Sequence, residues 1–231
     1  MRRLMSVLVA VLVAASFTGP TAVAAPAVAS APATGKTPVV FVHGFSGGSS
    51  ILFKEMIDKF KAAGWGDREL VRWDYDWKQS NFTTADQLKA KVAQVLRDTG
   101  AAKVDIVAHS MGSLSTRYYV KALGGTAKTK RWLSIGGVNQ GADVARLCPG
   151  FLFDSCADMK PGSRMLKALN DSSPAPAPTK YQTLSSSCDL MAPESKVKIP
   201  GVPNVDVGCY EHIYMPKGDR VITEAVKYLR G

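Results

Sequence analysis

The sequence has only three histidines and no cysteine before residue 148. Its basic residues are scattered, without a long run of Lys and Arg or a nucleic-acid-binding motif, which argues against a nucleic-acid partner. The one long apolar segment, residues 4–17, is shorter than the roughly 20 residues that span a bilayer. No later segment approaches that length. We therefore expect neither a transmembrane helix in the mature chain nor stable insertion into a membrane.

The first residues have the order of a secretory signal peptide. Arg2 and Arg3 precede the apolar segment, and small residues follow through Ala31. We predict a signal peptide over residues 1–29, with the cleavage point left open between 24 and 31. The Arg2-Arg3 pair leaves twin-arginine export as an alternative route. The mature protein is expected to be secreted.

The composition is that of one globular domain. The 231 residues are 46% hydrophobic and 21% charged, which is enough apolar material for one sizeable core. Residues 30–231 are therefore expected to form a single domain. The formal charge of +10 falls by two, to +8, when Arg2 and Arg3 leave with the signal peptide. Such a charge favours anionic surfaces, and we interpret the protein as a soluble, basic monomer.

Four cysteines in an exported chain predict two disulfides, for which three pairings are possible. We favour Cys148 with Cys156, which closes a short loop. The other pair is then Cys188 with Cys209. Free buried thiols are the alternative.

Apolar segments typical of buried strands alternate with segments of helical periodicity, which predicts an α/β fold. Its sheet is expected to be mostly parallel and covered by helices on both faces. Thr84 and Gln87 are placed as a capping box and Gly100 as a helix terminator. The expected strands cover residues 38–42, 70–73, 104–108, 131–135 and 181–184. The expected helices cover 53–60 before Gly64, 84–96, 113–123 and the C-terminal segment from Asp219.

Residues 141–179 lack clear periodicity. Long excursions of this kind in a compact domain are often functional. The segment is expected to form a lid, a wall of a substrate pocket, or a disulfide-pinned surface loop with one short helix around residues 165–169.

The most informative segment runs from Val104 to Gly112. An apolar strand leads directly into Ala108-His109-Ser110-Met111-Gly112 and then into a helical segment. In this setting a small-x-Ser-x-Gly turn strains the serine backbone and projects its hydroxyl above the sheet. Ser110 is therefore the candidate nucleophile, and an ordinary turn with an unreactive serine is the alternative.

A serine hydroxyl needs a neighbouring base to take its proton. His109 is joined directly to Ser110, so its ring should point away from the hydroxyl and support the turn. His43 ends the first strand, where it is expected to hold a loop by hydrogen bonding. His212, just before the last helix, remains as the candidate base.

The base needs a carboxylate to fix its tautomer. Asp189 follows the last expected strand and would emerge beside Ser110, and the order Ser110, Asp189, His212 suits the predicted fold. Rival carboxylates are Asp143, Asp206 and Glu211. A Cys188–Cys209 bond would join the acid loop to the base loop and hold the two side chains in register.

A tetrahedral intermediate would carry an oxyanion that needs fixed N–H donors. Met111 supplies one backbone N–H at the start of its helix. The second is expected from Phe45, in the glycine-rich loop that follows the first strand. A flexible loop without a role is the alternative, and a phosphate-binding loop is disfavoured because no Lys-Ser/Thr pair follows the glycines.

These segments resemble the small bacterial triacylglycerol lipases, including the Bacillus subtilis type and the actinobacterial class 2 lipases. The resemblance rests on residues 38–45, 107–112, 136–139 and 186–189, and it covers most of the chain from Thr37 onward. It implies a compact α/β-hydrolase fold without a cofactor; we assign no metal-binding residues, and metal dependence stays open. It also implies a catalytic triad and two oxyanion donors, at Ser110, Asp189, His212, Phe45 and Met111.

We therefore expect a secreted triacylglycerol lipase or esterase that works through an acyl-enzyme. Its substrate would be a lipid or another ester, with a lipid–water interface as one candidate place of action. Alternatives are a polyester depolymerase or cutinase-like enzyme, an acyltransferase, and a non-catalytic surface-binding protein on a hydrolase scaffold. The insertions after residues 141 and 189 leave the acyl-chain preference open.

Overall fold

A computed structural model of the chain describes residues 34–148 and 152–231. The predicted signal peptide and its cleavage point lie outside these described residues. No helix within them is both long enough and apolar enough to cross a membrane.

Six parallel strands form one sheet in the order β2-β1-β3-β4-β5-β6. The prediction of a mostly parallel sheet is confirmed, and five strands lie where the sequence placed them. The sixth, β6, was missed because it has only three residues, none of them fully buried. The strands are β1 (Val39–Val42), β2 (Leu70–Trp73), β3 (Val104–His109), β4 (Thr129–Ile135), β5 (Lys180–Ser185) and β6 (Asn204–Asp206).

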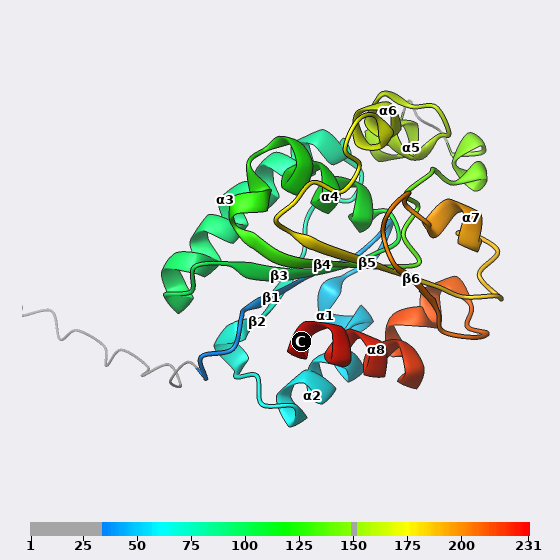
Figure 1. The fold of residues 1–231 in the computed structure, drawn as a ribbon. Helices are drawn as coiled ribbons and strands as arrows, with labels where there is room; N and C mark the ends of the chain where they lie inside the picture. The colour runs from blue at the N-terminus through cyan, green and yellow to red at the C-terminus, as the bar shows by residue number, and fades with distance from the viewer. Residues whose placement is uncertain (1–33, 149–151) are drawn as a thin grey trace, which may run out of the picture. The chain divides into compact units, whose positions relative to one another are not determined.

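Helices cover both faces of the sheet, as predicted (Figure 1). One face is packed by α2 (Lys54–Ala62) and α8 (Asp219–Arg230), and the other by α3 (Asn81–Thr99) and α4 (Gly112–Ala122). The remaining α-helices are α1 (Ser49–Leu52), α5 (Asp154–Met159), α6 (Arg164–Asn170) and α7 (Glu194–Val197). Short 3-10 helices are η1 (Asp67–Glu69), η2 (Gly125–Ala127), η3 (Asp143–Arg146) and η4 (His212–Lys217).

Alternation along β1 explains how both layers are held. Val39 and Phe41 join the core beneath α2 and α8, whereas Val40 and Val42 join the core beneath α3 and α4. A strand that is apolar at every position is the pattern of a sheet buried on both faces. The sequence reads Val39-Val40-Phe41-Val42 for this reason.

The start of α3 differs from the prediction. The helix begins at Asn81, and Ser80 is its N-cap because the Ser80 hydroxyl accepts a hydrogen bond from the Phe82 N–H. Thr84 lies in the first turn of the helix, where its hydroxyl donates to the Ser80 carbonyl. The predicted terminator Gly100 is confirmed, since its φ of 71° is the left-handed conformation that favours glycine.

Residues 141–179 contain more regular structure than the sequence predicted. The expected helix around residues 165–169 is α6, but η3 and α5 precede it. Both favoured disulfides are present: Cys148–Cys156 joins the end of η3 to α5, and Cys188–Cys209 joins the loops after β5 and β6. Asp158 of α5 accepts hydrogen bonds from the Asn81 N–H and the Ser80 hydroxyl at 2.6 and 3.0 Å. The excursion is therefore fastened to the beginning of α3.

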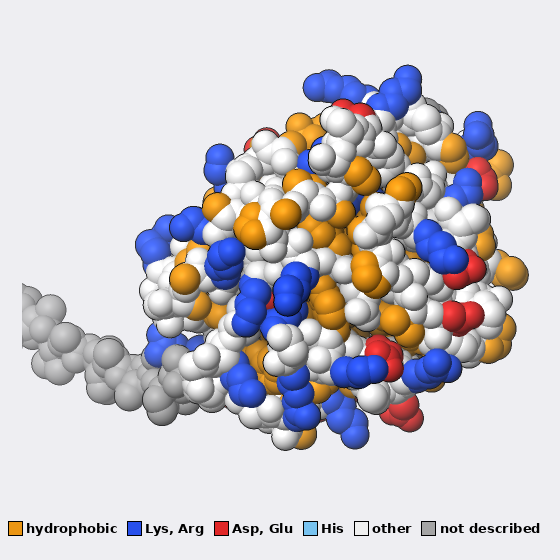
Figure 2. Space-filling view, viewed as in Figure 1, with side chains coloured by type: hydrophobic (Ala, Val, Ile, Leu, Met, Phe, Trp, Pro, Cys, Tyr) orange, Lys and Arg blue, Asp and Glu red, His pale blue; other side chains and the backbone are white. Residues whose placement is uncertain are grey.

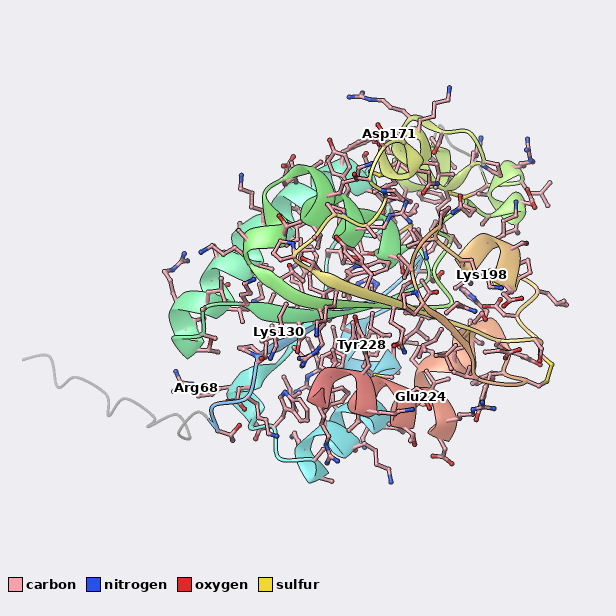
Figure 3. The ribbon with its side chains drawn as sticks, in the orientation of Figure 1. Arg68, Lys130, Asp171, Lys198, Glu224 and Tyr228 are labelled. Carbon is pink, nitrogen blue, oxygen red and sulfur yellow. A yellow bond between two sulfur atoms is a disulfide. The ribbon has the colours of Figure 1, made fainter. Side chains whose placement is uncertain are left out.

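Lys and Arg side chains are spread over the face that Figure 2 shows, and several of them lie near the starts of the strands. Lys130, labelled in Figure 3, lies at the beginning of β4, whereas Lys198 lies beyond α7 toward the other end of the sheet. Because the strands are parallel, Lys130 lies at the end of the sheet opposite to the end where Ser110 is found.

Candidate active site

The register of the strands brings the predicted site residues to one edge of the sheet. Val42 pairs with Ala108, and Ala108 pairs with Ser134. Ile135 pairs with Leu184 on the next strand. The segments that follow β1, β3, β4 and β5 therefore emerge together, at the carboxyl ends of parallel strands where ligands bind in open α/β sheets.

Ser110 occupies the strained turn that the sequence predicted. Its φ is 55°, a left-handed conformation that is uncommon for residues with a side chain. The turn needs small neighbours: a Cβ added to Gly112 would lie 2.3 Å from the His43 carbonyl oxygen, and one added to Gly44 would lie 2.7 Å from the Ser110 Cβ. The backbone of the loop after β1 thus passes directly beside the serine.

Ser110, His212 and Asp189 form a continuous hydrogen-bonded chain. The Ser110 Oγ lies 2.8 Å from the His212 Nε2, and the His212 Nδ1 lies 2.7 Å from the Asp189 Oδ2. All three residues are buried. The arrangement lets the imidazole accept the serine proton at one nitrogen while the carboxylate holds the other nitrogen protonated.

Asp189 is also fixed on its other side. Its Oδ1 accepts hydrogen bonds from the backbone N–H groups of Met191 and Ala192, at 3.0 and 2.8 Å. The rival carboxylates are all exposed, and Asp143 pairs instead with Lys196 at 3.0 Å. The structure brings only Asp189 among the four candidates into hydrogen-bond contact with His212.

The other two histidines have supporting places. The Nε2–H of His109 donates to the carbonyl oxygen of His212 at 3.0 Å, and burial lowers the pKa of His109 to about 3, so that its ring is neutral. The prediction that this ring turns away from the Ser110 hydroxyl fits the contact. Its partner, however, is the backbone of the base loop rather than the serine turn. His43 donates from Nδ1 to the Gly44 carbonyl at 2.8 Å, and burial also lowers its pKa.

The two predicted oxyanion donors lie next to Ser110, since Met111 follows it in the chain and the loop of Phe45 passes beside it. Met111 is the N-cap of α4, and Phe45 lines the pocket that contains Ser110. Within residues 34–148 and 152–231, neither backbone N–H donates to a backbone carbonyl. Both N–H groups therefore have free hydrogen-bonding capacity at the edge of the sheet that carries Ser110.

An apolar pocket of about 140 Å³ opens beside Ser110 and His212. Five described residues between 142 and 159 form one of its walls. Of the aromatic residues that the sequence suggested for an acyl pocket, Phe45 lines it, whereas Phe53 is buried in the core and Phe82 packs against Tyr118. Phe151 lies outside the described residues. The pocket is lined by Phe45, Val138, Ala142, Val144, Ala145, Cys148, Met159 and Met191, together with Ser110 and His212.

Large hydrophobic side chains are exposed around this end of the molecule. In the part of the chain that the structure describes, all of the strongly exposed ones follow the carboxyl ends of β1, β4, β5 or β6. Leu190 is 93% exposed and Leu147 is 87% exposed. We call this set the apolar rim: Ile51, Val144, Leu147, Leu152, Leu190, Met191, Ile213 and Tyr214.

The Cys188–Cys209 bond lies between the acid and the base of the candidate triad. Backbone contacts accompany it: the Ser187 N–H donates to the Gly208 carbonyl at 3.0 Å, and the Tyr210 N–H donates to the Ser186 hydroxyl at 2.8 Å. The bond thus closes a junction that hydrogen bonds already align.

Replacing Cys188 and Cys209 together by serine is expected to lower the free energy of unfolding by about 3 kcal/mol, because the open chain gains conformational entropy when unfolded. Urea denaturation of the variant and the wild type measures this difference. Unchanged midpoints and slopes would contradict it, and adding a reductant to the wild type should cause at least as large a loss, because the reductant also opens Cys148–Cys156.

Two supporting residues escaped the sequence analysis. The contact from His109 to His212 joins residues 103 positions apart, so no local pattern reveals it. Gly136, at φ 53°, lies against the acid and the base: a Cβ added there would be 3.1 Å from the Asp189 Oδ2 and 2.9 Å from the Met215 sulfur. The Gly136-Gly137 pair after a strand was the available signal. No three His, Cys, Asp or Glu side chains of the described residues gather in a way that would hold a metal ion.

Comparison with known proteins gives a family match over most of the chain. The sequence model of the family described as lipase (class 2) matches residues 36–204. This range includes Ser110 and Asp189 but ends before His212.

Solved structures show the same fold at low sequence identity. The mature lipase BlEst2 of Bacillus licheniformis has a TM-score of 0.72 and 20% identity, over 86% of this chain and 94% of its own. Aspergillus fumigatus lipase B has a TM-score of 0.72 and 16% identity, over 85% of this chain and 53% of its own. A thermophilic esterase from Thermogutta terrifontis has a TM-score of 0.59 and 15% identity, over 86% and 91%. The predicted α/β-hydrolase fold is confirmed.

Proposed function

The chain belongs to the class 2 lipase family and is an ester hydrolase, and from that premise we propose a secreted lipase or esterase that works through a Ser110-His212-Asp189 triad. The observation that carries the proposal is the buried chain of hydrogen bonds from the Ser110 Oγ through His212 to Asp189, at 2.8 and 2.7 Å. It lies beside an apolar pocket with two free backbone donors.

In the first step His212 Nε2 takes the proton of the Ser110 hydroxyl while Oγ attacks the ester carbonyl carbon. The carbonyl oxygen becomes an oxyanion, which the N–H groups of Phe45 and Met111 stabilise. His212 then gives its proton to the departing alcohol, the carbon–oxygen bond to that alcohol breaks, and an acyl-enzyme on Ser110 remains. Asp189 stabilises the imidazolium throughout.

The second step repeats this chemistry with water. His212 Nε2 takes a proton from a water molecule, whose oxygen attacks the acyl carbon. The collapse of the second oxyanion releases the carboxylic acid, and the proton on His212 returns to the Ser110 Oγ. The apolar lining of the pocket provides a place for the acyl chain during both steps.

A fluorophosphonate probe followed by peptide mass spectrometry tests this function directly. We expect one stoichiometric adduct, on Ser110, together with hydrolysis of p-nitrophenyl esters between acetate and palmitate. The chain-length optimum separates an esterase from a lipase, and assays with polyester films and alcohol acceptors test depolymerase and transferase activity. Folded protein that neither reacts with the probe nor hydrolyses any ester would contradict the proposal and favour a non-catalytic binding role.

We also propose that the apolar rim contacts the surface of a lipid substrate. It surrounds the edge of the sheet that carries the pocket, and two of its members, Val144 and Met191, line that pocket. Apolar side chains that enter the boundary between headgroups and acyl chains stabilise a protein on a lipid surface. The two disulfides support secretion, because disulfides persist in oxidising compartments outside the cytoplasm.

The double variant Leu147→Ser, Leu152→Ser is expected to lower the rate on emulsified triglyceride about 100-fold, because each leucine contributes about 1.5 kcal/mol when it leaves water, or about 3 kcal/mol for the two. The rate on dissolved p-nitrophenyl acetate should not change, since neither side chain lines the pocket. Thr223→Ser, on the exposed side of α8, is the control. Equal losses on both substrates would argue against contact with a lipid surface.

A further inference from the structure

The Phe45 ring lies in a cluster of three aromatic side chains. Its centroid is 4.5 Å from that of Trp77 and 6.1 Å from that of Phe153, both in edge-to-face geometry. The Trp77 and Phe153 rings lie 5.3 Å apart. Such arrangements stabilise the rings beyond the burial of their surface. Two distant segments, the loop between β2 and α3 and the residues before α5, thus meet on the side chain of residue 45.

The loop that carries Phe45 is fastened at both ends. At its start His43 stacks on Tyr75 at 4.3 Å, and the Tyr75 hydroxyl donates to the His43 carbonyl at 2.8 Å. At its end the Ser49 N–H donates to the Asp74 Oδ1 at 2.5 Å, and the Ser49 hydroxyl donates to the Trp73 carbonyl at 2.9 Å.

Between these two ends the Gly44 carbonyl accepts hydrogen bonds from the His43 Nδ1 at 2.8 Å and from the Gly47 N–H at 3.4 Å. The loop consists of Gly44, Phe45, Ser46, Gly47 and Gly48, and Ser46 has a positive φ of 54°. Glycines leave the backbone many conformations. Phe45 carries the only side chain in this stretch that is larger than serine, so the packing of its ring is the side-chain restraint on the Gly44–Phe45 peptide, in addition to the hydrogen bond that the Gly44 carbonyl accepts from His43.

Polar contacts hold Trp77 and Phe153 in a common frame. The Ser155 N–H donates to the Lys78 carbonyl at 3.3 Å, which joins α5 to the residue after Trp77. Asp158 adds the two hydrogen bonds to Ser80 and Asn81 described above, and the Cys148–Cys156 disulfide holds the same helix from the other side. The Trp77 and Phe153 rings are therefore held in place and can restrain the Phe45 ring that packs against them.

We propose that Trp77 and Phe153 are positioning residues for the oxyanion hole: they hold the Phe45 ring, and through it the Phe45 N–H, where the developing oxyanion will lie. This inference rests on the proposed ester hydrolysis at Ser110. It gives residues 141–179 a role besides forming the pocket wall. A misplacement of about 1 Å at a reacting centre can cost on the order of 100-fold in rate, and loss of one oxyanion donor costs about 100- to 1,000-fold.

We expect Trp77→Ala and Phe153→Ala each to lower kcat on p-nitrophenyl butyrate about 10- to 100-fold, with KM changed less than about threefold, because the N–H stabilises the transition state more than the substrate. Affinity for an alkyl boronic acid, which forms a tetrahedral adduct on the serine, should fall in parallel with kcat/KM. Trp77→Phe and Phe153→Leu should restore most of the loss in both measurements. Rates are normalised to titrated active sites.

Phe82→Ala is the matched control. Phe82 is a half-buried aromatic residue of the same core cluster, but it packs on Tyr118 at 4.8 Å and has no ring contact with Phe45. It should lower the melting temperature and leave kcat intact.

Unchanged kcat in folded Trp77→Ala and Phe153→Ala, or an equal loss in Phe82→Ala, overturns the inference. If the alanine variants do not fold, the same comparison with Trp77→Phe and Phe153→Leu decides: a graded fall in kcat and boronate affinity supports it, and wild-type values refute it. If the Trp77 and Phe153 variants keep wild-type kcat while Ser110→Ala is inactive, the positioning role is refuted and the proposed function stands. An active Ser110→Ala removes the function itself.

Discussion

Ser110→Ala is expected to lower kcat for p-nitrophenyl butyrate by at least about 10⁴-fold, since a triad without its nucleophile retains only the catalysis that binding and the oxyanion hole supply. The alanine methyl group cannot attack the carbonyl carbon or form an acyl-enzyme. Residue 110 has a positive φ, which is strained for serine and for alanine alike, so the substitution should leave the backbone strain unchanged. KM should change little, since the pocket lining is untouched.

Ser115→Ala is the control for this experiment. Ser115 lies on the same helix, and its hydroxyl donates to the Gly112 carbonyl rather than to His212. Steady-state kinetics and circular dichroism on both variants, beside the wild type, separate loss of the nucleophile from loss of the fold. Ester hydrolysis by purified Ser110→Ala at more than a few per cent of the wild-type rate would mean that another group attacks the ester.

Asp189→Asn is expected to lower kcat by about 10³- to 10⁴-fold at neutral pH, because it gives His212 the wrong tautomer. The backbone N–H groups of Met191 and Ala192 need an acceptor, so the asparagine oxygen will take the place of Oδ1. Its NH₂ group then faces the His212 Nδ1 and must donate to it. The ring proton moves to Nε2, which can no longer accept the proton of Ser110.

Asp143→Asn makes the same chemical change at the rival carboxylate. Asp143 is exposed and pairs with Lys196, so this variant should keep wild-type kcat. Melting temperatures should stay close to the wild type for both variants, because asparagine has nearly the size of aspartate. Equal activity of the two variants would show that Asp189 is not the acid partner of His212.

Much of the architecture could be predicted from local patterns. β1 is apolar at every position and β3 is apolar at four of its six, and such runs indicate strands that are buried on both faces. The Ala108 to Gly112 turn gives the place of Ser110, and only three histidines compete for the base. The positions of the three histidines in the chain distinguish their roles. In the structure, His212 contacts both Ser110 and Asp189.

The parts that escaped prediction depend on contacts between distant segments. β6 forms because Asn204 to Asp206 pair with β5, not because its own residues are apolar. The start of α3 depends on Asp158, whose carboxylate meets Ser80 and Asn81 from 77 residues further along the chain. No periodicity within residues 141–179 shows that Phe153 packs on Trp77 and Phe45. Sequence patterns predict burial and turns, whereas these three features depend on tertiary packing.

The Cys188–Cys209 bond also bears on when the protein becomes fully competent during its life. Thiols remain reduced in the cytoplasm, and disulfides form after export. A freshly synthesised chain would therefore have its acid and base loops joined only by hydrogen bonds, and the covalent junction would be added outside. Inside the producing cell the protein would be reduced and less stable. The disulfide-bonded, more stable protein would form only outside the cell membrane. In the proposed secreted protein, synthesis and covalent completion of the acid and base loops would thus be separated in space and in time.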